Sequence, residues 1–256
     1  MSSASRDAVR RAFALAERYD SHARVQRAVA EALADRIAAL PLPACPRVLE
    51  IGCGTGFLTQ ALRDRGIGGE WWITDIAPEM VERCRARIGE APGRHFAVLD
   101  GEHGTPPQGP FDLICSSLAM QWFDDQGAAI TRMLDWLAPG GHCLFTTLGQ
   151  GSFAEWRAAH AAEGLEAGTP GFMPVARFAA LLPARQAVPP EVTARIEHHA
   201  GAAAFLHALK AIGARTPARR HRPLAPAALR KVMRRFEAGG ASVTYEVVTC
   251  HYTRAT

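Results

Sequence analysis

The sequence lacks the features that mark several specialised classes of protein. It contains no apolar run close to the roughly 20 residues that a membrane-spanning helix needs. Residues 1–7 are polar, without the apolar stretch of a secretory signal peptide. Charged residues make up 21% of the 256 positions, which is ordinary for a folded domain and argues against a disordered chain. We therefore expect a globular, cytoplasmic protein with a sizeable core.

Cysteine pairs at metal-binding spacing are also absent. The six cysteines are scattered, and no two of them form a Cys-x-x-Cys pair. Zinc knuckles and dithiol redox sites both need such closely spaced thiols. The sequence therefore predicts no metal centre, and a reducing compartment is the expected setting.

From residue 47 to residue 148, short apolar runs alternate with segments of helical periodicity. Strands are predicted at 47–51, 71–75, 95–99, 111–117 and 142–148, and helices at 57–65, 78–88 and 128–137. Two further strands are predicted at 192–197 and 242–250. Strands that alternate with helices of this length predict an α/β fold, in which a mostly parallel sheet has helices on both faces.

Helical segments precede and interrupt this α/β region. Residues 1–44 are expected to form an N-terminal helical cap, because apolar residues recur at helical spacing from Val25 to Leu40. The main domain is then predicted over 45–256. Within it, residues 150–190 are rich in alanine and have no clear strand, so we expect a helical insertion over one end of the sheet. A further helix is predicted at 205–212.

Glycines are concentrated in residues 50–56, Glu-Ile-Gly-Cys-Gly-Thr-Gly, directly after the first predicted strand. Glycine lets the backbone turn tightly and approach a ligand closely, and open α/β sheets bind ligands at the carboxyl ends of their strands. The dinucleotide pattern Gly-x-Gly-x-x-Gly would need glycine at position 57, where Phe57 stands. The acid Glu50 disfavours a phosphate and favours a cationic group, such as the ammonium of an amino acid.

An acidic residue ends the second predicted strand, and another directly follows the third. A carboxylate at Asp75 can accept both hydroxyl groups of a ribose, and Asp100-Gly101 stands where an adenine edge would bind. Together with the glycine loop, these residues predict a site for an adenosine that bears an amino acid and no phosphate. For Asp75 alone, a helix N-cap before Pro78 is the alternative.

Three segments of this core resemble the motifs of class I S-adenosylmethionine-dependent methyltransferases: residues 48–56, Asp75-Ile76, and the Leu-Ala-Pro-Gly-Gly turn at 137–141. The resemblance implies a Rossmann-like fold with a seven-stranded sheet, and S-adenosylmethionine as the cofactor. Residues 13–26, 116–122 and 205–214 are similar to the malonyl-acyl-carrier-protein O-methyltransferases of biotin synthesis. That similarity implies methylation of the free malonyl carboxylate, the step that starts pimeloyl assembly.

The resemblance also implies site residues. The expected cofactor-binding residues are Tyr19, Gln26, Glu50, Gly52, Cys53, Gly54, Asp75, Ile76, Asp100, Gly101 and Ser116. The residues expected at the reacting groups are Tyr19, His22, Gln121 and Trp122. A carboxylate is already ionised at neutral pH, so no strong general base is required, and an aromatic face can stabilise a sulfonium. Structural roles stay open: a lid residue for Tyr19, a core residue for Trp122, and a surface or helix-cap residue for His22.

Basic charge is concentrated between residues 213 and 240, which contain eight basic residues and the single acid Glu237. Acyl carrier proteins are acidic, so such a cluster would steer their docking. The candidate docking residues are Arg219, Arg220, Arg222, Arg230, Arg234 and Arg235. A solvated, arginine-rich helix face is the alternative. Neither a nucleic acid nor a membrane is expected as a partner.

Other functions remain compatible with the same core. The chain could methylate another small carboxylic acid or a hydroxylated metabolite, or it could bind the cofactor without transferring a methyl group. A nicotinamide-dependent dehydrogenase is disfavoured by Glu50 and Phe57. The sequence leaves open whether the thiol carrier is a protein or coenzyme A, and which arginine meets the malonyl carboxylate.

Overall fold

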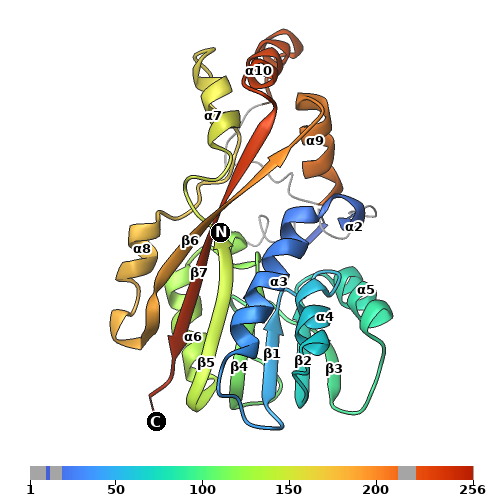
Figure 1. Cartoon of the computed structure of the whole chain (residues 1–256), viewed down its shortest axis with the longest axis vertical. Coiled ribbons are helices and arrows are strands. Elements are labelled where there is room, and N and C mark those ends of the chain that lie inside the picture. Colours follow the sequence, from blue (N-terminus) through green and yellow to red (C-terminus); the bar gives the residue numbers. More distant parts are fainter. Residues whose placement is uncertain (1–9, 12–18, 213–222, 256) are drawn as a thin grey trace.

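A single seven-stranded sheet organises the protein (Figure 1), in a computed structural model that describes residues 10–11, 19–212 and 223–255. The strands are β1 (Arg47–Ile51), β2 (Glu70–Asp75), β3 (Arg94–Val98), β4 (Phe111–Ser117), β5 (Leu137–Leu148), β6 (Gln186–His198) and β7 (Ser242–Thr253). Their order across the sheet is β3-β2-β1-β4-β5-β7-β6. The first five are parallel, and β7 runs antiparallel to both β5 and β6. This confirms the predicted α/β fold with a mostly parallel sheet.

Helices cover both faces of the sheet because side chains alternate along each buried strand. On one face lie α3 (Arg24–Ala38), α4 (Phe57–Asp64) and α5 (Pro78–Ile88), whose apolar side chains pack with Val48 and Leu113. The other face carries α6 (Gln126–Asp135) and α8 (Val175–Ala180), packed with Leu49 and Ile114. The predicted boundary between an N-terminal cap (residues 1–44) and the main domain (45–256) stays a prediction. In the structure, α3 of the cap segment packs directly on the sheet of the main domain.

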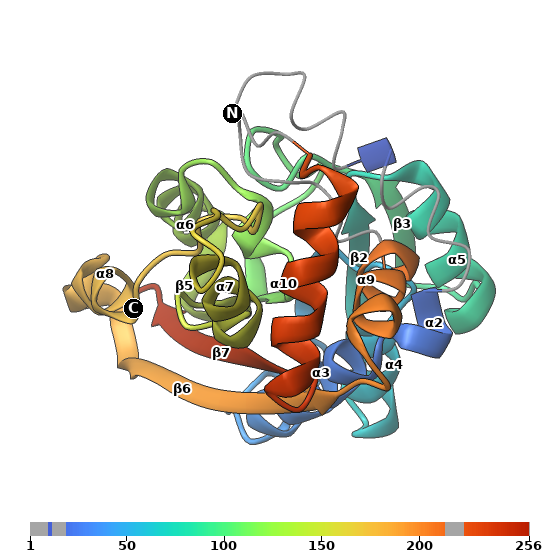
Figure 2. The same ribbon diagram turned by 90° about the horizontal axis from the view of Figure 1, so that it is seen from above.

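At the carboxyl ends of the parallel strands, three more helices form an upper layer (Figures 1 and 2): α7 (Ala154–Ala161), α9 (Ala202–Ala211) and α10 (Pro226–Ala238). Three aromatic side chains, Trp156, Phe205 and Phe236, join them, with ring centroids 5.3–5.4 Å apart. The short helix α2 (Tyr19–His22) lies beside α9 in both views. This layer therefore stands over the edge of the sheet where the glycine loop begins.

Several predicted boundaries are wrong. The helix expected to reach residue 137 ends at Asp135, and β5 starts at Leu137 instead of residue 142, because Leu137 pairs with Phe111 before a shift in register. Residues 150–190 were expected to lack a strand, yet β6 starts at Gln186 and includes Pro189-Pro190. Prolines are tolerated there because β6 is the last strand in the sheet order and its register shifts around them. The same segment does contain the helices α7 and α8, and the turn η2 (Pro183–Arg185).

Among the helices that the structure describes, none combines the length and the apolar character required to span a membrane.

Candidate active site

The three glycines of the loop after β1 all have positive φ angles, which favour glycine over other residues. A Cβ added at Gly52 would meet the Cβ of Ala119 at 2.4 Å, and one at Gly56 would meet the sulfur of Cys84 at 2.9 Å. At Gly54, with φ +53°, an added Cβ would meet nothing within 4 Å. The loop is therefore packed against protein at two glycines and borders open space at Gly54.

Asp75 ends β2 directly beside this loop and is 8% exposed. One carboxylate oxygen accepts the N–H of Gly54 and the other accepts the N–H of Ala77, both at 2.9 Å. Burial raises the pKa of Asp75, and the backbone hydrogen bonds partly oppose that shift. Ala77 is the residue that caps α5, so Asp75 is not a helix N-cap. Each oxygen keeps further acceptor capacity, and Ile76 beside it is partly buried.

Glu50 lies beneath the loop and is 1% exposed. Its carboxylate accepts the hydroxyl of Thr59 at 2.6 Å. Burial raises the pKa of Glu50 to about 8; the Thr59 hydrogen bond opposes this rise, and the charge of Asp75 adds to it. A cationic ligand group nearby would favour the ionised form again. Cys53, in the glycine loop, is also buried, and its thiol lies 3.6 Å from the carbonyl oxygen of Gly54.

Ser116, near the end of β4, supplies an unused polar atom. The side chain is 1% exposed, and its hydroxyl has no hydrogen-bond partner among the described residues. Buried hydroxyl groups are rarely left unpaired. Together with the open space at Gly54 and the spare acceptor capacity of Asp75, this orphaned hydroxyl fits a bound polar ligand at the carboxyl end of the sheet.

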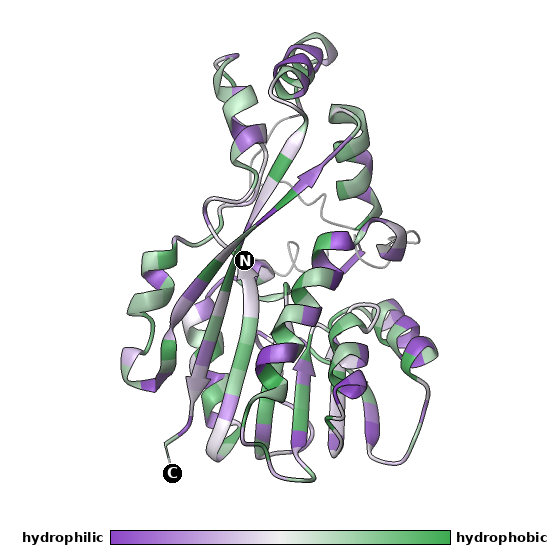
Figure 3. Ribbon diagram, viewed as in Figure 1, coloured by the Kyte–Doolittle hydropathy of each residue, from purple (hydrophilic) through white to green (hydrophobic). Residues whose placement is uncertain are grey.

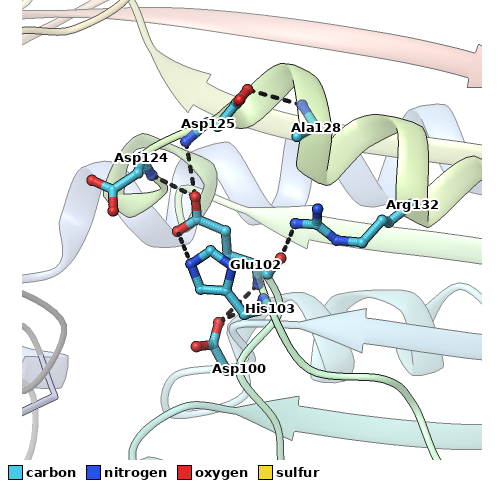
Figure 4. Close-up of polar contacts among 7 residues, drawn as sticks. All are labelled: Asp100, Glu102, His103, Asp124, Asp125, Ala128 and Arg132. Carbon is cyan, nitrogen blue, oxygen red and sulfur yellow. Dashed lines mark hydrogen bonds and ion pairs between the residues drawn. The ribbon is translucent and has the colours of Figure 1, made fainter. Parts of the chain in front are cut away.

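The loop after β3 is shaped by its own acids (Figure 4). Asp100 accepts the N–H groups of Glu102 and His103 at 2.9 and 3.1 Å. A Cβ added at Gly101 would lie 2.3 Å from the side chain of Ile51, so packing on β1 requires glycine there. Gly101 thus packs against the strand that leads into the glycine loop, and the adenine contact expected of Asp100 and Gly101 stays a prediction.

Glu102 was not predicted as a site residue, and it joins two loops (Figure 4). Its carboxylate is buried and accepts the N–H groups of Asp124 and Asp125, both at 2.8 Å, while Arg132 donates to its carbonyl. Glu102, His103 and Asp124 could together offer three ligand atoms to a metal ion. Because backbone donors already engage the Glu102 carboxylate, we assign this cluster to loop structure.

A cavity brings three of the expected residues together, Gln26, Gln121 and Trp122. It is lined by Gln26, Leu118, Gln121, Trp122, Leu148, Phe153, Pro170, Phe172, Ile212 and Tyr245. Gln26 comes from α3, and Gln121 and Trp122 from η1 (Met120–Trp122). The Gln121 amide is held in place, because it donates to the carbonyl of Leu118 at 2.5 Å and accepts the hydroxyl of Thr147 at 3.4 Å.

Two residues of the cavity wall adopt the left-handed conformation that favours glycine. Leu118 has φ +50° and Phe153 has φ +61°. Such backbone strain concentrates at functional sites. The rings of Phe153 and Tyr245 lie 5.2 Å apart. The sequence analysis did not predict either as a site residue, because neither belongs to a recognisable binding motif.

The N-terminal residues reach the site differently from the expectation. Tyr19 is the first residue of α2, and its side chain lies outside the described part of the structure. His22 does not line the cavity; its ring lies 5.5 Å from that of His207 in α9. Asp20, also in α2, accepts a hydrogen bond from the hydroxyl of Thr55 in the glycine loop at 2.7 Å. No sequence pattern marks Asp20, because its partner stands 35 residues away.

The basic stretch is divided by the limits of the structure. Arg219, Arg220 and Arg222 lie outside the described residues. Arg230, Lys231, Arg234 and Arg235 are exposed on α10, which carries both hydrophilic and hydrophobic segments (Figure 3). Arg235 pairs with Glu163 at 2.8 Å, and this hydrogen bond is the main reason that the pKa of Glu163 is lowered.

Comparison with known proteins places this arrangement in a family. The family model described as a methyltransferase domain matches residues 21–237. A biotin biosynthesis bifunctional protein BioCD from Bordetella avium is 50% identical over 242 residues, which cover 94% of this chain and 51% of that protein. The chain thus spans about half the length of this bifunctional relative. A malonyl-[acyl-carrier protein] O-methyltransferase from Magnetococcus marinus is 40% identical over 246 residues, 95% of this chain and 91% of that protein.

Solved structures share the fold at low sequence identity. The YcgJ protein from Bacillus subtilis has a TM-score of 0.62 at 16% identity, over 88% of this chain and 98% of that one. Phosphoethanolamine N-methyltransferase 2 from Haemonchus contortus, solved with S-adenosyl-L-methionine, has a TM-score of 0.55 at 14% identity, over 88% and 52%. With a family model over most of its length and a relative that it matches nearly end to end, the chain belongs to the malonyl-[acyl-carrier protein] O-methyltransferase family.

Proposed function

We propose that this protein transfers a methyl group from S-adenosylmethionine to the free carboxylate of malonyl-acyl carrier protein, the step that starts pimeloyl assembly in biotin synthesis. The observation that carries the proposal is a juxtaposition. Ala119, which lies against Gly52 of the glycine loop, directly follows Leu118 and stands two residues before Gln121, and both of these line the cavity. A nucleoside site and an acceptor cavity are therefore neighbours, in a chain with one relative named for this activity and another named for biotin biosynthesis.

The residues at the sheet edge fit the cofactor by their chemistry. Asp75 has spare acceptor capacity for ribose hydroxyls, Ser116 offers an unpaired hydroxyl, and Glu50 supplies negative charge when ionised. Gly54 leaves room for close approach of a ligand to the backbone. When bound, S-adenosylmethionine supplies a methyl group on a positively charged sulfur.

The acceptor side requires positioning more than acid–base chemistry. The malonyl carboxylate is ionised at neutral pH, so no residue has to remove a proton from it. Apolar and aromatic side chains make up most of the cavity wall and exclude water, which strengthens a carboxylate as nucleophile. Gln26 and Gln121 carry amide groups that can orient the malonyl carboxylate without neutralising its charge. Because hydrogen bonds fix the amide of Gln121, that amide can also restrict the motion of the bound carboxylate. Trp122 presents an aromatic ring suited to a nearby sulfonium.

Docking of the carrier protein is assigned to α10. Arg230, Lys231 and Arg234 are exposed there, while Glu163 neutralises part of the charge of Arg235. An acidic carrier would be drawn to this face by long-range attraction, which acts mainly on the rate of association. Val232 and Phe236 of α10 pack in the same apolar cluster as the cavity residues Phe153 and Tyr245, so a carrier bound on this helix could present its acyl group to the cavity.

Methyl transfer from labelled S-adenosylmethionine tests the reaction. The purified protein is mixed with malonyl carrier protein, and a base-labile methyl ester is expected. Acetyl carrier protein is the matched control, because it lacks the free carboxylate and should stay unlabelled. Labelling of a free small acid in preference to the malonyl thioester would reject the proposed acceptor.

Charge reversal tests the docking surface. Arg230→Glu with Arg234→Glu should lower activity on malonyl carrier protein and leave activity on a small malonyl thioester without phosphate groups nearly unchanged. Added salt should likewise reduce only the carrier-dependent rate. Arg177→Glu with Arg185→Glu, a reversal of two exposed arginines on α8 and η2, is the matched control. Equal effects of the two reversals would reject α10 as the docking face.

A further inference from the structure

A polar cluster outside the cavity joins three separate segments of the chain. One carboxylate oxygen of Asp20, in α2, accepts the hydroxyl of Thr55 at 2.7 Å, and the other pairs with the guanidinium of Arg87. Arg87, in the last turn of α5, also donates to the hydroxyl oxygen of Thr55 at 3.3 Å. Thr55 stands between Gly54 and Gly56, so this cluster attaches α2 directly to the glycine loop.

An aromatic ring helps to hold Arg87 in place. The guanidinium carbon of Arg87 lies 4.7 Å from the ring centroid of Phe57, the first residue of α4, and that of Arg27 lies 4.6 Å from the same centroid. Arginine stacks well on aromatic faces. A stacked arginine side chain is already restricted, so it loses less conformational entropy when it forms an ion pair. Arg87 is therefore held ready as a partner for Asp20.

The other end of α2 contacts the acceptor side of the molecule. The ring of His22 lies 5.5 Å from the ring of His207 in α9. The residue that follows α9, Ile212, lines the cavity beside Gln121. Figure 1 shows α2 between α9 above it and the helices α4 and α5 below it. One four-residue helix thus contacts both the glycine loop and the helix that leads into the cavity wall.

We propose that Asp20 is a positioning residue that holds α2 across the glycine loop and thereby joins the cofactor site to the acceptor side. The proposal rests on the assignment of the glycine loop to the cofactor. A helix of four residues is not stable by itself, so its place depends on tertiary contacts. Loss of the Asp20 carboxylate would release α2 and leave both Thr55 and Arg87 without this partner, and the loop would have to be ordered again when the cofactor binds.

Binding of S-adenosylhomocysteine, measured by calorimetry, tests this role. Asp20→Ala should weaken binding about five- to tenfold, the scale of one ordinary net hydrogen bond. Asp20→Asn keeps an oxygen for Thr55 but not the ion pair, and a smaller loss is expected. In a double-mutant cycle, Asp20→Ala with Arg87→Ala should bind no more weakly than the weaker of the two single variants, because both remove the same contact.

Asp35→Ala is the matched control. Asp35 lies on α3 and pairs with Arg65 at 2.8 Å, with most of its side chain exposed and without a contact to the glycine loop. This variant should bind S-adenosylhomocysteine like the wild type. A purely structural role for Asp20 would lower the melting temperature of Asp20→Ala and leave its binding of S-adenosylhomocysteine like that of Asp35→Ala.

Hydrogen exchange separates the possible failures. In the protein without ligand, Asp20→Ala should speed exchange at residues 19–22 and 53–57, and Asp35→Ala should not. Unchanged exchange together with wild-type affinity in Asp20→Ala would overturn the proposal. If the wild type itself bound no S-adenosylhomocysteine, the cofactor assignment and the joining of the two sites would both fall, while the exchange data would still report whether Asp20 orders α2 and the loop.

Discussion

Replacing Gly54 with alanine separates the cost of backbone strain from the loss of a ligand. Gly54 has φ +53°, and a Cβ at this position would meet no protein atom within 4 Å. The substitution therefore introduces strain without a clash inside the protein. If the open space beside Gly54 belongs to the cofactor, however, the new methyl group would stand where the cofactor has to approach the backbone.

The stability cost can be set from the φ angle alone. Placing a non-glycine residue in the left-handed region costs about 1–2 kcal/mol. For a chain of this size, each 1 kcal/mol lowers the melting temperature by roughly 2–4 °C. Gly66→Ala is a matched control, because Gly66 has φ +77°, meets nothing within 4 Å and lies in an exposed turn after α4. Both variants should lose similar stability.

The two variants should then differ only in binding. Calorimetric titration with S-adenosylhomocysteine is expected to show at least a tenfold loss for Gly54→Ala, about 1.4 kcal/mol, and no change for Gly66→Ala. Gly52→Ala should behave differently from both, since its Cβ would lie 2.4 Å from that of Ala119 and the loop itself would have to move. Wild-type affinity in Gly54→Ala, with melting lowered as in the control, would refute the placement of the cofactor at this glycine.

Three further outcomes are expected. Asp75→Ala should weaken S-adenosylhomocysteine binding by about 1–3 kcal/mol and also lower the unfolding free energy, because two backbone N–H groups lose their acceptor; unchanged calorimetric affinity would contradict the ribose assignment. Glu102→Ala should lower the melting temperature and slow methyl transfer. Glu102→Gln keeps an oxygen for the same two N–H groups, so its melting temperature and its rate should both stay close to those of the wild type. Burial and the neighbouring His142 lower the pKa of His251 to about 4, so its protonation favours the unfolded chain and stability should fall as the pH drops from about 6.5 towards 4. Urea titrations at several pH values should show a weaker fall in His251→Gln, and an identical fall would contradict this assignment.

Local pattern was sufficient to predict much of the framework. The predicted ranges of β1, β4 and α5 agree with the structure at both ends, because apolar periodicity, Pro78 and the flanking glycines act within a few residues of one another. The glycine loop and Asp75 were likewise visible in sequence, since each follows a strand of a parallel sheet and parallel strands end at one edge. Prediction failed where tertiary pairing decides the structure, as at Gln186, where the edge position of β6 accommodates two prolines.

The sequence by itself therefore determined the α/β fold, the order of strand, loop and helix at the cofactor site, and the family resemblance, since all three depend on neighbours along the chain. Only the tertiary structure decided that Asp20 meets Thr55 and Arg87, that Glu102 ties two loops together, and that Phe153 and Tyr245 complete a cavity with Gln26. These partners are separated by 20 to more than 200 residues, and their distances follow from the order of strands in the sheet and the packing of helices on it, which no local pattern encodes.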